Sequence, residues 1–162
     1  MVEMPEEARR LIHEKLEKED LDFDGCHFPS INMGGLKFRR AATFRKATFH
    51  GGTSFAGSTF FKGASFSRAK FLGPVSFTRV KFSGRATFSK AEFEDKALFS
   101  GAKFRGLCSQ MLLLKGKTVF SGTIFEEEAI FADAFLLGTT SFSQSKLARA
   151  NFKFIITFLG IE

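Results

Sequence analysis

The sequence predicts an all-β protein, a parallel solenoid built from short stacked strands. Phe supplies 24 of the 162 residues, while Trp and Tyr are absent. From Phe38 to Phe104 all Phe residues except Phe61 follow one another alternately six and five residues apart. A small side chain, most often Ala, lies two residues before almost every one of them. A fixed period of this kind is the sequence signature of a repeat architecture.

The repeat has a period of 11 residues, which contains two central positions, or centres. These centres are Phe38, Phe44, Phe49, Phe55, Phe60, Phe66, Phe71, Phe77, Phe82, Phe88, Phe93, Phe99 and Phe104, and they resume at Leu114, Phe120, Phe125, Phe131, Leu136, Phe142, Leu147 and Phe152. One residue is missing between Phe104 and Leu114. We therefore expect the ladder there to bulge or break, and at least one of Met111, Leu112 and Leu113 to form an exposed apolar patch.

The spacing inside each unit indicates strands. An 11-residue apolar period can also indicate a right-handed helical supercoil. On a helix, however, residues i−2 and i lie about 200° apart, whereas in a strand they point the same way. Gly also recurs two residues after the centres, where it would cost a helix about 1 kcal/mol each time but suits a tight corner. Such short strands must stack coil upon coil, so that the Phe and small side chains fill one continuous core.

The units resemble those of the pentapeptide-repeat proteins. Ala42-Thr43-Phe44, Ala69-Lys70-Phe71 and Ala102-Lys103-Phe104 follow the family's order of a small residue, a polar residue and a central Leu or Phe. The resemblance covers roughly residues 21–158 and implies a right-handed four-sided β-helix with one unit on each face. The extra residue in every second unit departs from the family pattern. It predicts about 22 residues per coil, two wider corners and about six coils.

Residues 5–20 carry the only helical pattern. Pro5 opens it, and Ala8, Leu11, Ile12 and Leu16 form an apolar stripe. Because the first coil of a solenoid exposes its core end-on, we expect this helix to cap it, with partner binding by the helix as the alternative. The predicted organisation is a capping helix at 1–20, a β-helix at 21–158 and a C-terminal tail at 159–162.

Composition restricts the class and the compartment of the protein. A hydrophobic share of 44% with 25% charged residues is too apolar for a disordered chain. No stretch reaches the roughly 20 apolar residues of a membrane helix, and residues 1–20 lack the apolar run of a signal peptide. Cys26 and Cys108 are interpreted as small buried thiols of a reducing compartment. A cytoplasmic protein is expected.

Residue sets for catalysis are not found. His13, His27 and His50 are scattered and are interpreted as surface histidines. The acidic run at 126–128, with Asp133, lacks the spacing of a metal-binding loop and is interpreted as a solvated face. There is no nucleophile beside a base, no phosphate-binding Gly loop and no Cys/His ligand set. We therefore expect no enzymatic activity, cofactor, metal or small-molecule substrate.

The predicted stacking aligns basic side chains. Residues 22 apart should lie one coil above another, which forms a row of Lys37, Thr59, Lys81, Lys103, Ile124 and Lys146. The carboxylates Glu92, Glu94 and Asp95 should fall mainly on the opposite face. With a net charge of +7, the candidate residues for binding a polyanion are Lys37, Arg39, Arg40, Lys46, Lys62, Arg68, Lys81, Lys90, Lys103 and Arg105.

These cations have two interpretations. They can form a basic strip that binds nucleic acid or an anionic membrane surface. Alternatively, they keep a regular β surface soluble and block edge pairing. Apart from Phe61, aromatic side chains are missing from the outward positions, which weakens the case for binding single strands.

The C-terminal segment is strongly apolar. If Phe158 is a further centre, the last coil leaves an open edge and an exposed core end, which favour association. The candidate contact residues of a homodimer are Phe152, Phe154, Ile156, Phe158 and Leu159. Contact with a membrane or with a downstream segment is the alternative.

Three functions are compatible with these features. The sequence favours a non-catalytic binding or scaffold module with an unknown protein partner. A basic-face binder of nucleic acid or membrane is second. The resemblance implies a third, because some pentapeptide-repeat proteins inhibit type II topoisomerases as acidic mimics of DNA. The net charge of +7 argues against this last function.

Overall fold

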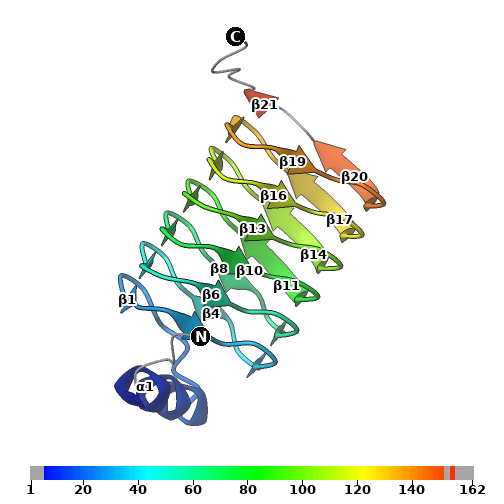
Figure 1. The fold of residues 1–162 in the computed structure, drawn as a ribbon. Helices are drawn as coiled ribbons and strands as arrows, with labels where there is room; N and C mark the ends of the chain where they lie inside the picture. Colours follow the sequence, from blue (N-terminus) through cyan, green and yellow to red (C-terminus); the bar gives the residue numbers. More distant parts are fainter. Residues whose placement is uncertain (1–5, 152–153, 156–162) are drawn as a thin grey trace.

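The computed structural model describes residues 6–151 and 154–155. One α-helix is followed by short strands that wind in successive coils, and the helix lies at one end of the stack (Figure 1). The coils contain about 22 residues, and about six of them are stacked, as the sequence predicted. No helix in the described part of the chain is long and apolar enough to cross a membrane.

The strands form three parallel sheets. One contains β1 (His27–Phe28), β5 (Thr48–Phe49), β9 (Lys70–Phe71), β12 (Glu92–Phe93), β15 (Leu113–Leu114), β18 (Ala134–Leu136) and β21 (Phe154–Ile155). The second contains β2 (Ile31–Asn32), β6 (Thr53–Ser54), β10 (Val75–Ser76), β13 (Ala97–Leu98), β16 (Thr118–Val119) and β19 (Thr140–Ser141). The third contains β3 (Lys37–Phe38), β7 (Thr59–Phe60), β11 (Lys81–Thr87), β14 (Lys103–Cys108), β17 (Ile124–Ile130) and β20 (Lys146–Asn151), with β4 (Ala42–Thr43) and β8 (Ala64–Ser65) alongside.

Each coil has four faces, named here by their inward-pointing centres. Face 1 carries Phe23, Phe44, Phe66, Phe88, Ser109 and Phe131; face 2 carries Phe28, Phe49, Phe71, Phe93, Leu114 and Leu136; face 3 carries Met33, Phe55, Phe77, Phe99, Phe120 and Phe142; face 4 carries Phe38, Phe60, Phe82, Phe104, Phe125 and Leu147. The rings stack almost parallel from coil to coil. On face 1, for example, Phe44 and Phe66 have centroids 4.9 Å apart and planes 1° apart.

The Phe columns form the core. All twelve centres from Phe44 to Phe104 are at most 3% exposed, as predicted. The Ala residues two positions earlier, such as Ala69, Ala91 and Ala102, are fully buried beside them. A strand places both positions on its inner side, and the small side chain leaves room for the ring of the neighbouring face.

The corners are of two kinds, because units of five and six residues alternate. The five-residue units turn tightly, with one residue at positive φ. Lys46, Arg68 and Lys90 take this position between faces 1 and 2, with φ values of 58°, 61° and 59°. The six-residue units make the wider corners between faces 2 and 3 and between faces 4 and 1. At the second wide corner, β11, β14, β17 and β20 run continuously from face 4 into face 1, as the broad arrows in Figure 1 show.

The missing residue falls in this wide corner. β14 pairs with β11 and β17, but the register shifts between Phe104 and Leu107. The predicted bulge is therefore present, and Met111 is 49% exposed. Leu112, in contrast, is buried, because the shorter corner restores the register before that residue is reached.

The N-terminal helix α1 (Glu6–Glu17) packs against the first coil through buried Ile12 and partly buried Leu16. The predicted stripe was too wide, since Leu11 is 46% exposed. It lies about 100° around the helix from Ile12 and points away from the coil.

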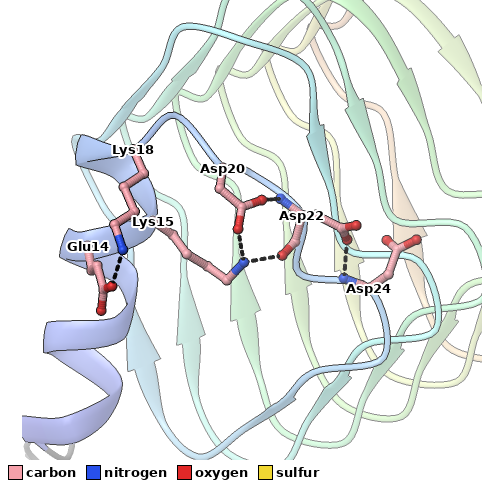
Figure 2. Close-up of polar contacts among 6 residues, drawn as sticks. All are labelled: Glu14, Lys15, Lys18, Asp20, Asp22 and Asp24. Carbon is pink, nitrogen blue, oxygen red and sulfur yellow. Dashed lines mark hydrogen bonds and ion pairs between the residues drawn. The ribbon is translucent and has the colours of Figure 1, made fainter.

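Polar contacts also fasten the helix to the first coil (Figure 2). Lys15 Nζ donates to Asp20 Oδ2 at 2.7 Å and to the Asp22 carbonyl at 2.8 Å. The Asp24 amide in turn donates to Asp22 Oδ1 at 2.9 Å. The same ammonium lies 5.4 Å from the centroid of the Phe23 ring. Lys15 therefore links the helix to the segment that enters face 1.

Candidate polyanion-binding surface

The row predicted on face 4 is present. Strand pairing aligns Lys37 with Thr59, Thr59 with Lys81, and Lys81 with Lys103. Beyond Lys103 the row continues through Ile124 to Lys146. Neighbouring strands lie about 4.8 Å apart, so Lys81 and Lys103 present two ammonium groups from adjacent coils on the outer side of one sheet.

The wide corner beside face 4 adds further cations. Arg39 and Arg40 follow Phe38, and Lys62 follows Phe60 on the next coil. Arg85 lies one coil further on, with its backbone carbonyl against Gly63. These side chains are exposed. We call the set Lys37, Arg39, Arg40, Lys62, Lys81, Arg85 and Lys103 the basic edge.

Most cations of the basic edge have no carboxylate partner among the described residues. Arg40 pairs with Glu19 from the end of the helix segment. The other six cations make no ion pair with a described residue. The basic edge therefore combines close positive charges with little internal neutralisation.

Face 2, on the opposite side of the coil, is neutralised instead. Lys70 aligns with Glu92 on the next strand, with Nζ and Oε2 3.8 Å apart. Lys115 Nζ donates to Glu94 Oε1 at 2.8 Å, and this hydrogen bond raises the pKa of Lys115. Face 2 thus places a carboxylate beside each of these two lysines, whereas face 4 places Lys81 beside Lys103.

The basic edge ends where it meets the acidic run at residues 126–128. Arg105 Nε donates to Glu127 Oε1 at 2.9 Å, and this bond raises the pKa of Arg105. Here the wide corner is hollowed into an open groove of ≈ 710 Å³, lined by Gly84, Arg85, Arg105, Gly106, Glu126, Glu127, Glu128, Ala148 and Arg149. Of the candidate residues, Arg105 therefore belongs to a mixed-charge groove.

Three candidate cations lie elsewhere. Lys46, Arg68 and Lys90 form their own row on the tight corner between faces 1 and 2, and all three are exposed. Face 1, whose outward side chains include Ser65, separates them from the basic edge. These three cations therefore do not belong to the basic edge.

Arg85 and Arg149 were missed by the sequence reasoning. Both lie in the wide corner between faces 4 and 1, where the one-residue shifts break the 22-residue spacing: Arg85 pairs with Gly106, and Glu128 pairs with Arg149. The alignment runs from Arg85 to Gly106, Glu128 and Arg149 in steps of 21, 22 and 21, so a constant period does not lead from one arginine to the other.

Phe61 is the one large apolar side chain that the basic edge surrounds. It is 45% exposed, and its amide donates to the Phe38 carbonyl at 3.0 Å, which places it one coil above Arg39. Lys62 follows it in the chain. An exposed ring among cations can stack on a base or enter an apolar phase.

All three histidines are exposed, as interpreted, but two of them are not scattered. His27 Nδ1 lies 3.0 Å from His50 Nε2, and the rings stack with centroids 5.3 Å apart. The residues are 23 apart, because His27 precedes the centre of its unit and His50 follows the centre one coil on. A search at the 22-residue period could not find this pair.

The cysteines are free and half-buried rather than fully buried. Burial raises the pKa of the Cys26 thiol. Within residues 6–151 and 154–155, no group of three or more His, Cys, Asp or Glu side chains could hold a metal ion. The side chains of the proposed dimer contact, Phe152, Phe154, Ile156, Phe158 and Leu159, lie outside the described part, although the backbone of β21 pairs with β18.

A family model described as pentapeptide repeats (9 copies) matches residues 23–70 and 66–109, which together make up more than half of the chain. No curated protein matches. The matched residues include every member of the basic edge.

Proposed function

Because the chain belongs to the pentapeptide-repeat family, we propose that it is a non-catalytic binding scaffold whose basic edge holds a nucleic acid by its phosphate backbone. The observation that carries the proposal is the pairing of Lys81 with Lys103 on adjacent strands without a carboxylate partner. Like charges directly opposite each other in a sheet are destabilising. Face 2 avoids this cost by placing Glu92 next to Lys70.

The dimensions of the basic edge suit a short stretch of phosphate backbone. From Lys37 to Lys103 the row crosses three strand intervals, about 14 Å. That length corresponds to about four base-pair steps at 3.4 Å each. Side chains that reach backbone phosphates fix position without reading sequence, so the expected binding is weak, salt-dependent and indifferent to sequence.

A membrane surface is the less favoured polyanion. Peripheral membrane segments combine basic residues with several apolar side chains that enter the headgroup region. On the basic edge only Phe61 is a large exposed apolar side chain. One ring supplies much less buried apolar area than such segments use, whereas it is sufficient for a base to stack on.

Fluorescence anisotropy with a labelled 20-base-pair duplex tests this proposal. We expect binding that weakens with salt, with a slope of log K against log[salt] of about −3 to −4 for about four phosphate contacts. The Lys81→Glu/Lys103→Glu variant should lose most of the binding. Lys96→Glu/Lys117→Glu is the matched control, because Lys96 and Lys117 are also exposed neighbours on adjacent coils, but at the wide corner between faces 2 and 3.

The two variants carry the same net charge, +3 instead of +7. Equal weakening of binding in both would mean that overall charge, not the basic edge, attracts the nucleic acid. Sedimentation with anionic vesicles serves as the competing assay. Retention on vesicles without measurable duplex binding would overturn the nucleic-acid proposal in favour of a membrane surface.

A protein partner is the second candidate, and face 3 supports it. The outward residues of its strands include Ser54, Ser76, Leu98 and Val119, all of them uncharged. A shallow groove of ≈ 310 Å³ lies along its first coils. A pull-down from native lysate with and without nuclease distinguishes the two candidates, because a protein held through face 3 survives the nuclease.

A further inference from the structure

His27 and His50 bring two imidazoles together at the N-terminal end of face 2. His27 begins β1, and His50 follows the last residue of β5. The two strands are paired, and the His50 amide donates to the Phe28 carbonyl at 2.8 Å. Both histidines are exposed. The pairing of β1 with β5 therefore fixes the backbone positions from which the two side chains extend.

We propose that His27 and His50 form a bidentate site for a divalent transition-metal ion of the Cu²⁺, Ni²⁺ or Zn²⁺ type. Imidazole nitrogens bind such an ion at about 2.0–2.1 Å, so two nitrogens on one ion are about 2.8–3.4 Å apart at cis or tetrahedral angles. The observed distance between His27 Nδ1 and His50 Nε2 is 3.0 Å. The two donor atoms already have the spacing that one ion requires.

Without a metal ion, one of these nitrogens carries a proton and donates to the lone pair of the other. When the metal ion binds, the proton of the donating ring moves to that ring's other nitrogen. Both rings stay neutral, and both facing lone pairs are free. Rotation of the two rings then aims the lone pairs at a common point on the solvent side, and both rings have room to rotate because neither side chain is enclosed.

The surroundings determine which ions fit. Thr48 and then Lys70 follow His27 along its row, and Leu72 follows His50. No carboxylate lies in these positions, and the described residues offer no third ligand. Water must complete the coordination. A site with two nitrogens and no carboxylate favours Cu²⁺, Ni²⁺ and Zn²⁺ over Mg²⁺ and Ca²⁺, which prefer oxygen ligands.

A bound ion would also join the first coil to the second. His27 belongs to the coil that α1 covers, and His50 belongs to the next one. An ion that binds the folded chain more tightly than the unfolded chain raises the apparent stability by mass action. The site would thus stabilise the end of the solenoid at which the helix is attached.

Isothermal titration of the untagged protein with CuCl₂, NiCl₂ and MgCl₂ tests the site. We expect one Cu²⁺ or Ni²⁺ per chain, no Mg²⁺ binding, and affinity reduced by about tenfold or more in either His27→Ala or His50→Ala. His13→Ala is the control, because His13 lies on α1 beside Glu17 and has no second imidazole near it. Electron paramagnetic resonance of the Cu²⁺ complex should show coupling to two imidazole nitrogens in the wild type and to one in His50→Ala.

The results can overturn the proposal in two ways. Wild-type protein that binds no Cu²⁺ or Ni²⁺ at millimolar concentration has no such site. Equal affinities in the wild type, His27→Ala and His50→Ala would place the ion elsewhere, and a loss in His13→Ala alone would place it on the helix. Circular dichroism of each variant verifies that the solenoid is folded, so that a lost site is not confused with a lost fold.

Discussion

Ser109 lies on face 1 at the position that Phe88 fills one coil earlier. The Phe88 amide donates to the carbonyl of Cys108, the residue before Ser109, at 2.8 Å, and Thr87 pairs with Cys108. Leu107 and Leu112 flank Ser109 in the chain, and both are buried in rows that carry Ala in the neighbouring coils. Ser109 thus takes the place of a Phe, while Leu107 and Leu112 take the places of Ala residues. This exchange tends to conserve the volume of the core.

The hydroxyl of Ser109 is expected to cost stability. Its Oγ is buried and has no hydrogen-bond partner among the described residues. Ser109→Ala should therefore raise the free energy of unfolding by about 1 kcal/mol, since an unsatisfied buried hydroxyl costs about 1–3 kcal/mol. Urea unfolding measures the change.

The matched comparison for this prediction is Thr123→Val. Thr123 is also buried, but its Oγ1 donates to the Phe99 carbonyl at 2.8 Å. Removing that bond should lower the free energy of unfolding by about 1 kcal/mol. If both variants change the free energy of unfolding in the same direction, the missing hydrogen bond of the Ser109 hydroxyl does not explain the change seen in Ser109→Ala.

Phe77 tests the ring columns. It is fully buried and stacks on Phe55 and Phe99 with centroids 5.0 Å away in each case. Phe77→Ala should lower the free energy of unfolding by about 3–5 kcal/mol through lost burial and an unfilled cavity. Exposed Phe61→Ala should change it by less than about 0.5 kcal/mol. A small effect at Phe77, measured by denaturant unfolding, would contradict a continuous packed core.

The period alone predicted most of this fold. Phe44 and Phe66 stack, and Lys81 and Lys103 align, because residues at one repeat interval must coincide once coils stack. The uninterrupted strand from face 4 into face 1 was not predictable in this way. It depends on how the wide corner bends, and the spacing of the centres does not encode that bend. Arg85 was missed because the residues beside it in its row, Gly63 and Gly106, carry no charge and so form no basic row in the sequence.

Asp24 should make the stability depend on acid pH. Partial burial raises the pKa of this carboxyl, but hydrogen bonds from Thr43 and Arg45 outweigh burial, and the net effect lowers the pKa. Arg45 Nε donates to Asp24 Oδ2 at 2.7 Å. A lowered folded-state pKa adds stability that is present above the ordinary value of 3.8 and is lost as the pH falls through the lowered pKa.

The Asp24→Asn variant isolates this contribution. Its melting temperature should lie below that of the wild type at pH 7, and the difference should shrink as the pH is lowered from about 5 to about 2.5. Asp95→Asn is the control, because exposed Asp95 makes no ion pair with a described residue. A difference between wild type and Asp24→Asn that stays constant over this range would show that ionisation of Asp24 does not contribute.

Self-association through the C-terminal segment stays a prediction from the sequence. The residues from Phe152 to Ile161 are mainly apolar, and an exposed apolar edge favours pairing. Sedimentation equilibrium should detect a dimer at tens of micromolar, a range typical of about −6 to −7 kcal/mol of binding free energy. Phe158→Glu should shift it to monomer. A wild-type monomer at these concentrations would exclude a dimer of this strength.

Phe61 is expected to make the basic edge bind single-stranded nucleic acid differently from a duplex. A duplex keeps its bases stacked inside, so it can use only the cations, whereas a single strand can also place a base on the ring. Stacking on an aromatic side chain contributes about 1–3 kcal/mol per base, which corresponds to roughly fivefold to more than a hundredfold in affinity. Phe61→Ser should therefore weaken binding of a 20-nucleotide single strand and leave duplex binding almost unchanged. Anisotropy titrations of both ligands at one salt concentration measure the two effects, and equal losses would mean that Phe61 supports the shape of the corner instead of contacting a base.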